Sequence, residues 1–86
     1  MKGIESKKLF NTRMLIGTDV TVVTKVPGLV IHGTFFEYFE KNDTVVLRNY
    51  EIYRLEEGEW ELEDKGDLIL IKGDGWVEIK ARRFKI

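Results

Sequence analysis

Hydrophobic and polar residues alternate with a period of two along most of the chain, which is the pattern of strands that bury one face. Five segments show this pattern, and each is bounded by turn residues such as Pro, Gly, Asn and Asp. They are VTVVTKV at 20–26, LVIHGTFFEYFE at 29–40, TVVLRNYEIYRL at 44–55, LILIK at 68–72 and WVEIKA at 76–81. The acidic stretch 56–67 places Trp60 and Leu62 between glutamates, which predicts a half-exposed extension of a strand.

Residues 4–16 show a different spacing. Leu9, Arg13 and Ile16 lie three to four positions apart, which predicts one or two turns of helix that Gly17 would end. The pattern as a whole therefore predicts an all-β fold preceded by a short N-terminal α-helix.

Two of the strand segments carry irregularities that predict bends. In the second segment Ile31, Phe35 and Phe39 share one face, and Gly33 lies between them. A glycine inside a strand is typical of a bulge or a barrel corner. In the third segment the apolar parity slips near Arg48-Asn49, which predicts a second bulge.

Five antiparallel strands with such bends, within about 80 residues, close most economically into a small barrel. We therefore expect one domain over residues 1–86, with an N-terminal helix region at 1–16, a five-stranded, strongly bent antiparallel barrel at 17–81 and a basic tail at 82–86.

The segments Leu68–Ile71 and 30–39 carry apolar residues on both faces of the strand, and one small barrel cannot bury both faces. We interpret these segments as covered in part by the N-terminal helix and in part by a second copy of the chain. The last two strands, at 68–72 and 76–81, are the expected pairing edges between subunits. A head-to-tail contact of this kind closes into a ring or grows into a filament.

The composition argues against several kinds of functional site. The chain has no cysteine and one histidine, His32, so thiolate or multi-histidine metal sites are not expected, and no cofactor is predicted. No Ser/His/Asp set or phosphate-binding glycine loop can be assembled, so an enzyme is not expected. No apolar run is long enough to cross a membrane, and no signal peptide is evident, so we expect a cytoplasmic protein. Abundant Glu, Lys, Ile and Val without Gln resemble the composition of hyperthermophile proteins.

The formal net charge is −1, whereas proteins that bind duplex DNA non-specifically are usually strongly basic, so duplex DNA is not an expected partner. The charge is nevertheless uneven. Residues 51–67 hold eight carboxylates against two basic residues, and both chain termini are basic. A metal site among these carboxylates is less expected than a solvated strand face.

Three stretches resemble the Sm and Sm-like family of RNA-binding proteins, especially its archaeal members. LIGTDVTVVTK (15–25) resembles the opening of the family's domain, GTFFEYFEKNDTVVL (33–47) its first motif, and IKGDGWV (71–77) its second motif. The resemblance covers residues 9 to about 80. It implies a Sm fold (an SH3-like barrel), a homo-oligomeric ring that is a heptamer in typical archaeal relatives, and binding of single-stranded, U-rich RNA in RNA processing, turnover or chaperoning.

The resemblance also implies the site residues, which are Lys72, Gly73, Asp74, Asn42, Asp43 and Thr44. Lys72 would lean over a base or contact a phosphate, Gly73 would let a nucleotide approach the backbone, and Asp74 would orient the lysine or accept a hydrogen bond.

The family's acidic residue and asparagine, which build part of a uridine pocket, are not both present. Without a gap Phe39 and Asp43 take their places, and with one bulged residue Glu40 and Thr44 do so, with Asn42 as a neighbour. Uridine selectivity is therefore the least supported part of the expectation.

Plainer alternatives remain open. KGDG could be only a hairpin turn, because Asp-Gly favours such turns, and KND could be only a bend. The basic residues around Phe84 could touch RNA or form a frayed strand end. The chain could also be a protein-interaction scaffold of the same barrel type with little RNA affinity.

Overall fold

The computed structural model describes residues 16–82, which form one antiparallel sheet of five strands in the order β4-β3-β2-β1-β5. The predicted all-β, five-stranded antiparallel fold is confirmed, whereas the predicted helix in 1–16 and the tail beyond residue 82 lie outside the described residues. The strands are β1 (Asp19–Thr24), β2 (Leu29–Phe39), β3 (Thr44–Glu56), β4 (Glu59–Ile71) and β5 (Trp76–Ala81), with a 3-10 turn, η2 (Gly73–Gly75), between β4 and β5.

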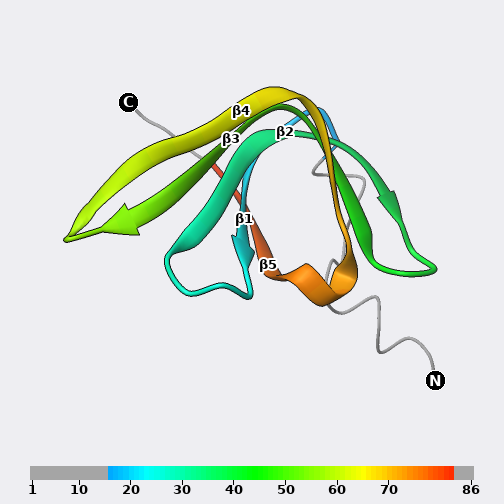
Figure 1. The fold of residues 1–86 in the computed structure, drawn as a ribbon. Coiled ribbons are helices and arrows are strands. Elements are labelled where there is room, and N and C mark those ends of the chain that lie inside the picture. Colours follow the sequence, from blue (N-terminus) through cyan, green and yellow to red (C-terminus); the bar gives the residue numbers. More distant parts are fainter. Residues whose placement is uncertain (1–15, 83–86) are drawn as a thin grey trace.

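The sheet is strongly bent, and Figure 1 shows β2, β3 and β4 arching over β1 and β5. Its order is linear, so β4 and β5 are the two edges and the barrel stays open within the protomer. This openness is where the structure departs from a closed barrel. Within residues 16–82 it leaves two edge strands that pair with a neighbour on one side only, and these are the strands expected to pair between copies.

The bends come from β-bulges. The pairing of β2 with β3 shifts between His32 and Thr34, beside Gly33, and Asn49 on the facing strand has a positive φ of 51°. A Cβ at Gly33 would lie 3.1 Å from both the Arg48 carbonyl oxygen and the Leu47 Cβ, so the close approach there favours glycine. The two irregularities that the sequence predicted, at Gly33 and near Arg48-Asn49, are therefore confirmed as the two sides of one bulge, in which β3 carries the extra residue.

A further shift lies between Phe35 and Glu37, where β2 carries one extra residue, as the alignment with one bulged residue supposed without giving its position. It corrects the assignment of one residue. The sequence placed Phe39 on the same face as Ile31 and Phe35. Because the shift adds a residue between them, Phe35 is fully buried whereas Phe39 is 44% exposed.

The core takes side chains from all five strands. Each strand presents alternate apolar residues to the concave side, as the burial of Val20 and Val22 on β1 shows. Burying each such side chain stabilises the fold by roughly 1.5–3 kcal/mol. The core cluster consists of Val20, Val22, Ile31, Phe35, Val45, Leu47, Ile71 and Trp76.

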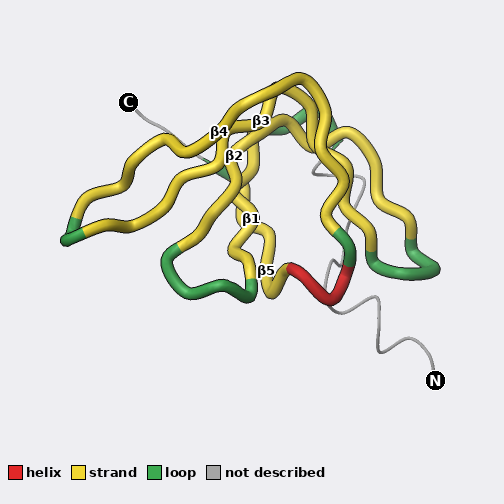
Figure 2. Tube along the Cα trace, in the orientation of Figure 1, coloured by secondary structure: helices red, strands yellow, loops and turns green. Residues whose placement is uncertain are grey.

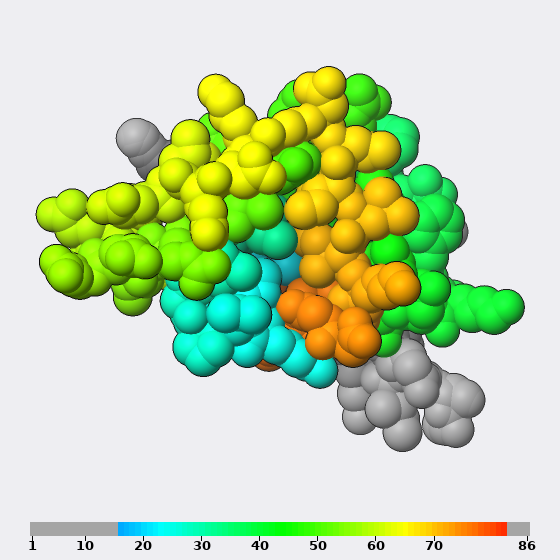
Figure 3. Space-filling view, viewed as in Figure 1, coloured from blue at the N-terminus to red at the C-terminus, as the bar shows by residue number. Residues whose placement is uncertain are grey.

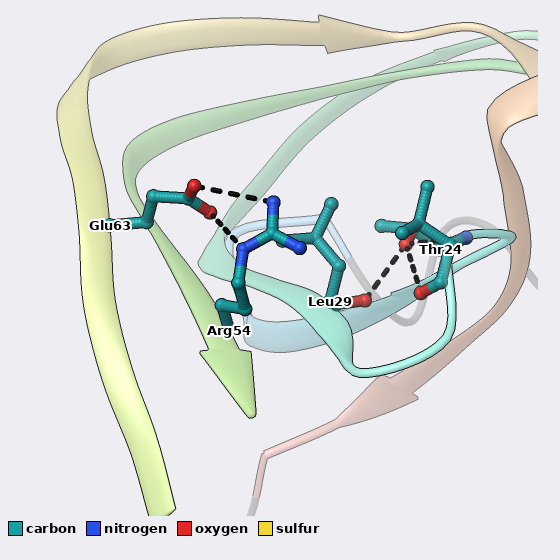
Figure 4. A network of polar contacts seen from close by, with 5 residues as sticks. Thr24, Leu29, Arg54 and Glu63 are labelled. Atoms are coloured by element: carbon teal, nitrogen blue, oxygen red, sulfur yellow. Dashed lines mark hydrogen bonds and ion pairs between the residues drawn. The ribbon is translucent and has the colours of Figure 1, made fainter. Parts of the chain in front are cut away.

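The turn from β1 to β2 is fixed by a buried threonine and a glycine (Figure 4). Thr24 Oγ1 accepts a hydrogen bond from the Val26 N–H at 3.1 Å and donates to the Leu29 carbonyl at 2.8 Å. Gly28 follows Pro27 with a φ of +77°, which is the left-handed region that favours glycine.

The far ends of β3 and β4 form a long hairpin, which we call the arm (Glu51–Lys65). Its residues 51–54 still pair with β2, and only the part beyond Leu55 extends past the other strands. Glu57 and Gly58 both have positive φ at its tip, as a two-residue hairpin turn of type I′ requires. Figure 2 shows the arm protruding from the rest of the sheet. The predicted strand extension is confirmed, because Trp60 and Leu62 are about half exposed within β4.

Strand β4 does not bury both faces within one protomer, although its sequence was interpreted as covered on both. Ile71 is 8% exposed, whereas Leu68 and Leu70 are 53% and 58% exposed. In the space-filling view β4 runs uncovered from the arm towards η2 (Figure 3). The apolar outer side of this edge is therefore bare in a single copy.

Candidate nucleic-acid interface

The two turns that the sequence singled out lie against each other in the protomer. The first follows β2 at residues 40–43, and the second is Lys72 with η2. The Gly73 N–H donates to the Asn42 carbonyl at 3.3 Å, and the Trp76 indole N–H donates to the Asp43 carbonyl at 2.7 Å. We call this unit the joined turns. Residues thirty positions apart in the sequence thus form one surface.

Gly73 is required by the contact between the turns. A Cβ on this residue would lie 2.6 Å from the Asp43 Cβ and 2.7 Å from the Asn42 carbonyl oxygen, which is closer than real Cβ atoms approach. The sequence interpretation gave Gly73 the role of admitting a nucleotide to the backbone. In the structure the group that approaches its backbone is the neighbouring turn.

The second turn is not the hairpin turn that Asp74-Gly75 predicted, so the hairpin part of this alternative is wrong. Strands β4 and β5 lie at opposite edges of the sheet, so no hairpin joins them. Gly73–Gly75 forms a single 3-10 turn in which the Gly75 N–H donates to the Lys72 carbonyl at 2.8 Å, and neither Gly73 nor Gly75 has a positive φ.

The predicted site residues differ in what they can offer a ligand. Asn42, Lys72 and Asp74 are exposed, and the backbone of Gly73 is half-buried between them. Asp43 is half-buried, has a φ of 53° and accepts a hydrogen bond from the Tyr38 hydroxyl. Thr44 is only 4% exposed at the start of β3, so its side chain faces the protein interior.

Sequence reasoning missed the two aromatic residues that support the joined turns. Tyr38 fixes the Asp43 carboxylate, and the fully buried Trp76 fixes the Asp43 carbonyl. The position of Trp76 directly after Gly75 was a usable signal. A buried indole needs an acceptor for its N–H, and the preceding turn is expected to bring one close.

The exposed charge of the joined turns is mixed. Lys41 and Lys72 contribute two exposed cations, Glu40 and Asp74 contribute two exposed carboxylates, and the carboxylate of Asp43 is half-buried. Among the described residues the ion pair found is that of Arg54 with Glu63 on the arm, at 3.1 Å (Figure 4). Lys72 is therefore not held by a carboxylate of residues 16–82.

Residues 16–82 contain no group of three His, Asp or Glu side chains arranged to hold a metal ion. The same part of the chain contains no helix with the length and apolar character needed to cross a membrane.

No family model and no curated protein matches the chain. Solved structures do match it. The Pyrococcus abyssii Sm protein, solved in complex with a uridine heptamer, is 26% identical, with a TM-score of 0.66 over 81% of this chain and 90% of that one. A heptameric archaeal Sm protein is 17% identical, with a TM-score of 0.61 over 81% and 93% of the two chains. The P. aerophilum SmAP1 heptamer is 15% identical, with a TM-score of 0.62 over 94% and 95%. The family resemblance read from the motifs is thereby confirmed, and the chain is a structural relative of the archaeal Sm proteins over most of its length.

Proposed function

We propose that this chain assembles into a homo-oligomeric ring and binds single-stranded, U-rich RNA at the joined turns. The observation that carries the proposal is the packing of the 40–43 turn on Lys72 and η2, which sets Asn42, Lys72 and Asp74 side by side. The most similar structure reported above is an Sm protein bound to a uridine heptamer.

The ring is supported by the sheet edges. Among residues 16–82, β4 and β5 each pair with another strand on one side only, and Leu68 and Leu70 leave apolar surface beside one of these edges. Pairing β4 of one copy with β5 of the next would satisfy both edges and cover the leucines. Seven copies are proposed from the two heptameric neighbours.

Assembly would also compensate for the lack of net electrostatic attraction between a single site and RNA. The joined turns of one protomer hold two exposed lysines against two exposed carboxylates, Glu40 and Asp74, and the half-buried Asp43, so a single site gives a polyanion no net attraction. A ring repeats the same lysines around one axis, so one RNA strand engages several sites and avidity raises the affinity. Lys72 would contact a base or phosphate, while Asn42 and Asp74 would hydrogen-bond base edges exposed in single strands.

The test is a fluorescence-anisotropy titration with oligo-U, oligo-A and oligo-C at about 50 and 200 mM salt. Oligo-U should bind most tightly and weaken at the higher salt, and Lys72→Met should lose most of this binding. Lys72→Arg should bind more tightly than the parent, because guanidinium stacks and donates in a plane. No binding of any oligomer at low micromolar subunit concentration would contradict the proposal.

A scaffold with little RNA affinity is the second candidate. The arm favours it, because it projects carboxylates on one face and Leu55, Trp60 and Leu62 on the other, each of these three between 43% and 51% exposed. The same titration separates the two functions, since a scaffold would assemble but leave all three oligomers unbound.

A further inference from the structure

A second surface, away from the joined turns, has the features of a small-ligand site. It is a cleft of about 430 Å³ lined by residues of all five strands, which include Val23, Val30, His32, Tyr53, Trp60 and Lys80. This volume lies in the range of small-molecule sites. We call it the outer cleft, because it lies on the opposite face of the sheet from the core.

The strand register explains which residues form the base of the outer cleft. Lys80, Thr21 and His32 are successive cross-strand partners on β5, β1 and β2, and they form a polar row. Val23, Val30 and Tyr53 form the adjacent row on the same face. A polar row beside an apolar, aromatic row suits a planar ligand that has both a flat face and a polar edge.

The aromatic groups are positioned for such a ligand. The rings of His32 and Tyr53 lie 5.0 Å apart at 49°, and the Tyr53 hydroxyl donates to Glu51 at 2.9 Å, which holds the phenol in place. The Trp60 side chain lines the same cleft and is 51% exposed, so part of its indole ring is available for a ligand to stack on. Stacking of one base on an aromatic side chain contributes about 1–3 kcal/mol.

His32 has an unused hydrogen-bonding atom. Its Nδ1 is buried and has no hydrogen-bond partner among the described residues. Burial and the charge of Arg82 lower the pKa of His32, against an opposing effect of Glu51, so the imidazole is neutral at pH 7 and keeps one acceptor nitrogen. A rotation about χ2 would present that nitrogen to the polar edge of a ligand.

Cations stand at one end of the cleft. Lys80 lines it, and Arg82 follows two residues later along the same face and is exposed. Two carboxylates share this face. Glu51 already accepts the Tyr53 hydroxyl, and Glu78 is the cross-strand partner of Val23 and is exposed. An uncharged hydrocarbon ligand would use neither the imidazole nor the cations. A heterocyclic base with an attached phosphate would use the aromatic faces, the imidazole and the cations together.

We propose that the outer cleft is a nucleotide-binding site, in which the base lies against Tyr53 and Trp60, its polar edge meets His32, and its phosphate meets Lys80. The site is separate from the joined turns, and the residues named belong to one protomer, although Lys80 lies on β5, which we propose pairs with the next copy. It would let an RNA strand touch a second face of the protein.

The test is a titration of the full chain with adenosine and uridine 5′-monophosphates, followed by tryptophan fluorescence. Trp60 reports on the cleft, and the buried Trp76 gives a constant background. We expect saturable quenching in about the millimolar range, no quenching by ribose 5-phosphate, and about tenfold weaker binding in His32→Phe, which keeps a ring but loses both nitrogens. Lys80→Met should also weaken binding, whereas Lys25→Met, an exposed lysine that does not line the cleft, should not.

Three results would overturn the proposal. These are equal quenching by ribose 5-phosphate, unchanged affinity in both folded variants, and binding that appears only when the chain is shortened after Arg82. The last result would mean that the chain's own C-terminal segment fills the cleft. Because Lys72→Met tests only the joined turns, loss of oligo-U binding with intact mononucleotide quenching separates failure of one site from failure of the other.

Discussion

Gly73 is the residue on which the contact between the two turns depends. In Gly73→Ala the added Cβ would meet the Asp43 Cβ at 2.6 Å and the Asn42 carbonyl at 2.7 Å, and two stretches of backbone would have to separate. Overpacking of this kind costs about 1–3 kcal/mol, so we expect a lower denaturation midpoint and weaker oligo-U binding. Gly75→Ala is the matched control, because its Cβ would meet only the Ile71 Cγ2, at an ordinary 3.8 Å. Equal effects of the two changes would show that the turns need not touch.

His32 gives the fold a pH dependence whose sign follows from its surroundings. Burial and Arg82 lower its pKa from the usual 6.5, while Glu51 partly opposes them. As the pH falls through 6.5, the unfolded chain takes up a proton more readily than the folded protein, so stability declines until the folded pKa is passed. We expect the urea concentration at the midpoint of unfolding to decrease as the pH is lowered from 7.5 to about 5.5. In His32→Phe this decrease should be smaller. A slope that His32→Phe leaves unchanged would assign the effect to other groups.

The turn between β1 and β2 depends on one hydroxyl group. Thr24→Val keeps the shape and β-branching of the side chain but removes the bonds to the Val26 N–H and the Leu29 carbonyl, and Thr24 is only 8% exposed. Buried groups left without partners cost about 1–3 kcal/mol, so we expect a loss of stability of that order in equilibrium urea unfolding. Thr34→Val is the control, because its bond to Asp19 is exposed. Comparable losses in both variants would mean that burial does not set the cost.

At the level of elements, the sequence predicted features that neighbouring residues determine, but it did not predict features that depend on how the strands are arranged in the sheet. The bulge at Gly33 and Asn49 was predictable, since a glycine on one strand and a parity slip on the other mark it. The position of the shift after Phe35 was not, because Phe36 and Phe39 are apolar on either face. The hairpin prediction from the Asp74-Gly75 pair was wrong for a different reason. Its hairpin preference is real, but the strands it connects lie at opposite edges of the sheet, and local residues do not encode that.

The candidate site was predictable to a similar extent. The motifs pointed to both turns, and the structure brings the turns together through Gly73 and Asp43. Which side chains remain available could not be predicted, because Thr44 and Asp43 are adjacent in sequence yet only Thr44 is fully buried. Tyr38 and Trp76 act through contacts between distant strands, so spacing alone does not reveal them.

At the scale of the whole molecule, assembly and RNA binding should fail together. Leu70 is 58% exposed on the edge strand β4, so Leu70→Glu changes little inside the protomer but places a charge where a second copy would pair. Light scattering should show the mass falling from that of a ring, seven protomers in the heptameric neighbours, towards that of one chain of 10.1 kDa.

The control for this change is Val26→Glu. Val26 is also exposed, at 48%, but lies in the turn between β1 and β2 and away from both edges, so its variant should still assemble. Oligo-U affinity should fall sharply in Leu70→Glu, although every residue of the joined turns is intact, because a single protomer cannot supply avidity. Mononucleotide quenching at the outer cleft should persist in the same variant. A Leu70→Glu protein that is monomeric yet binds oligo-U as tightly as the parent would show that one protomer suffices and that the ring is not the RNA-binding unit.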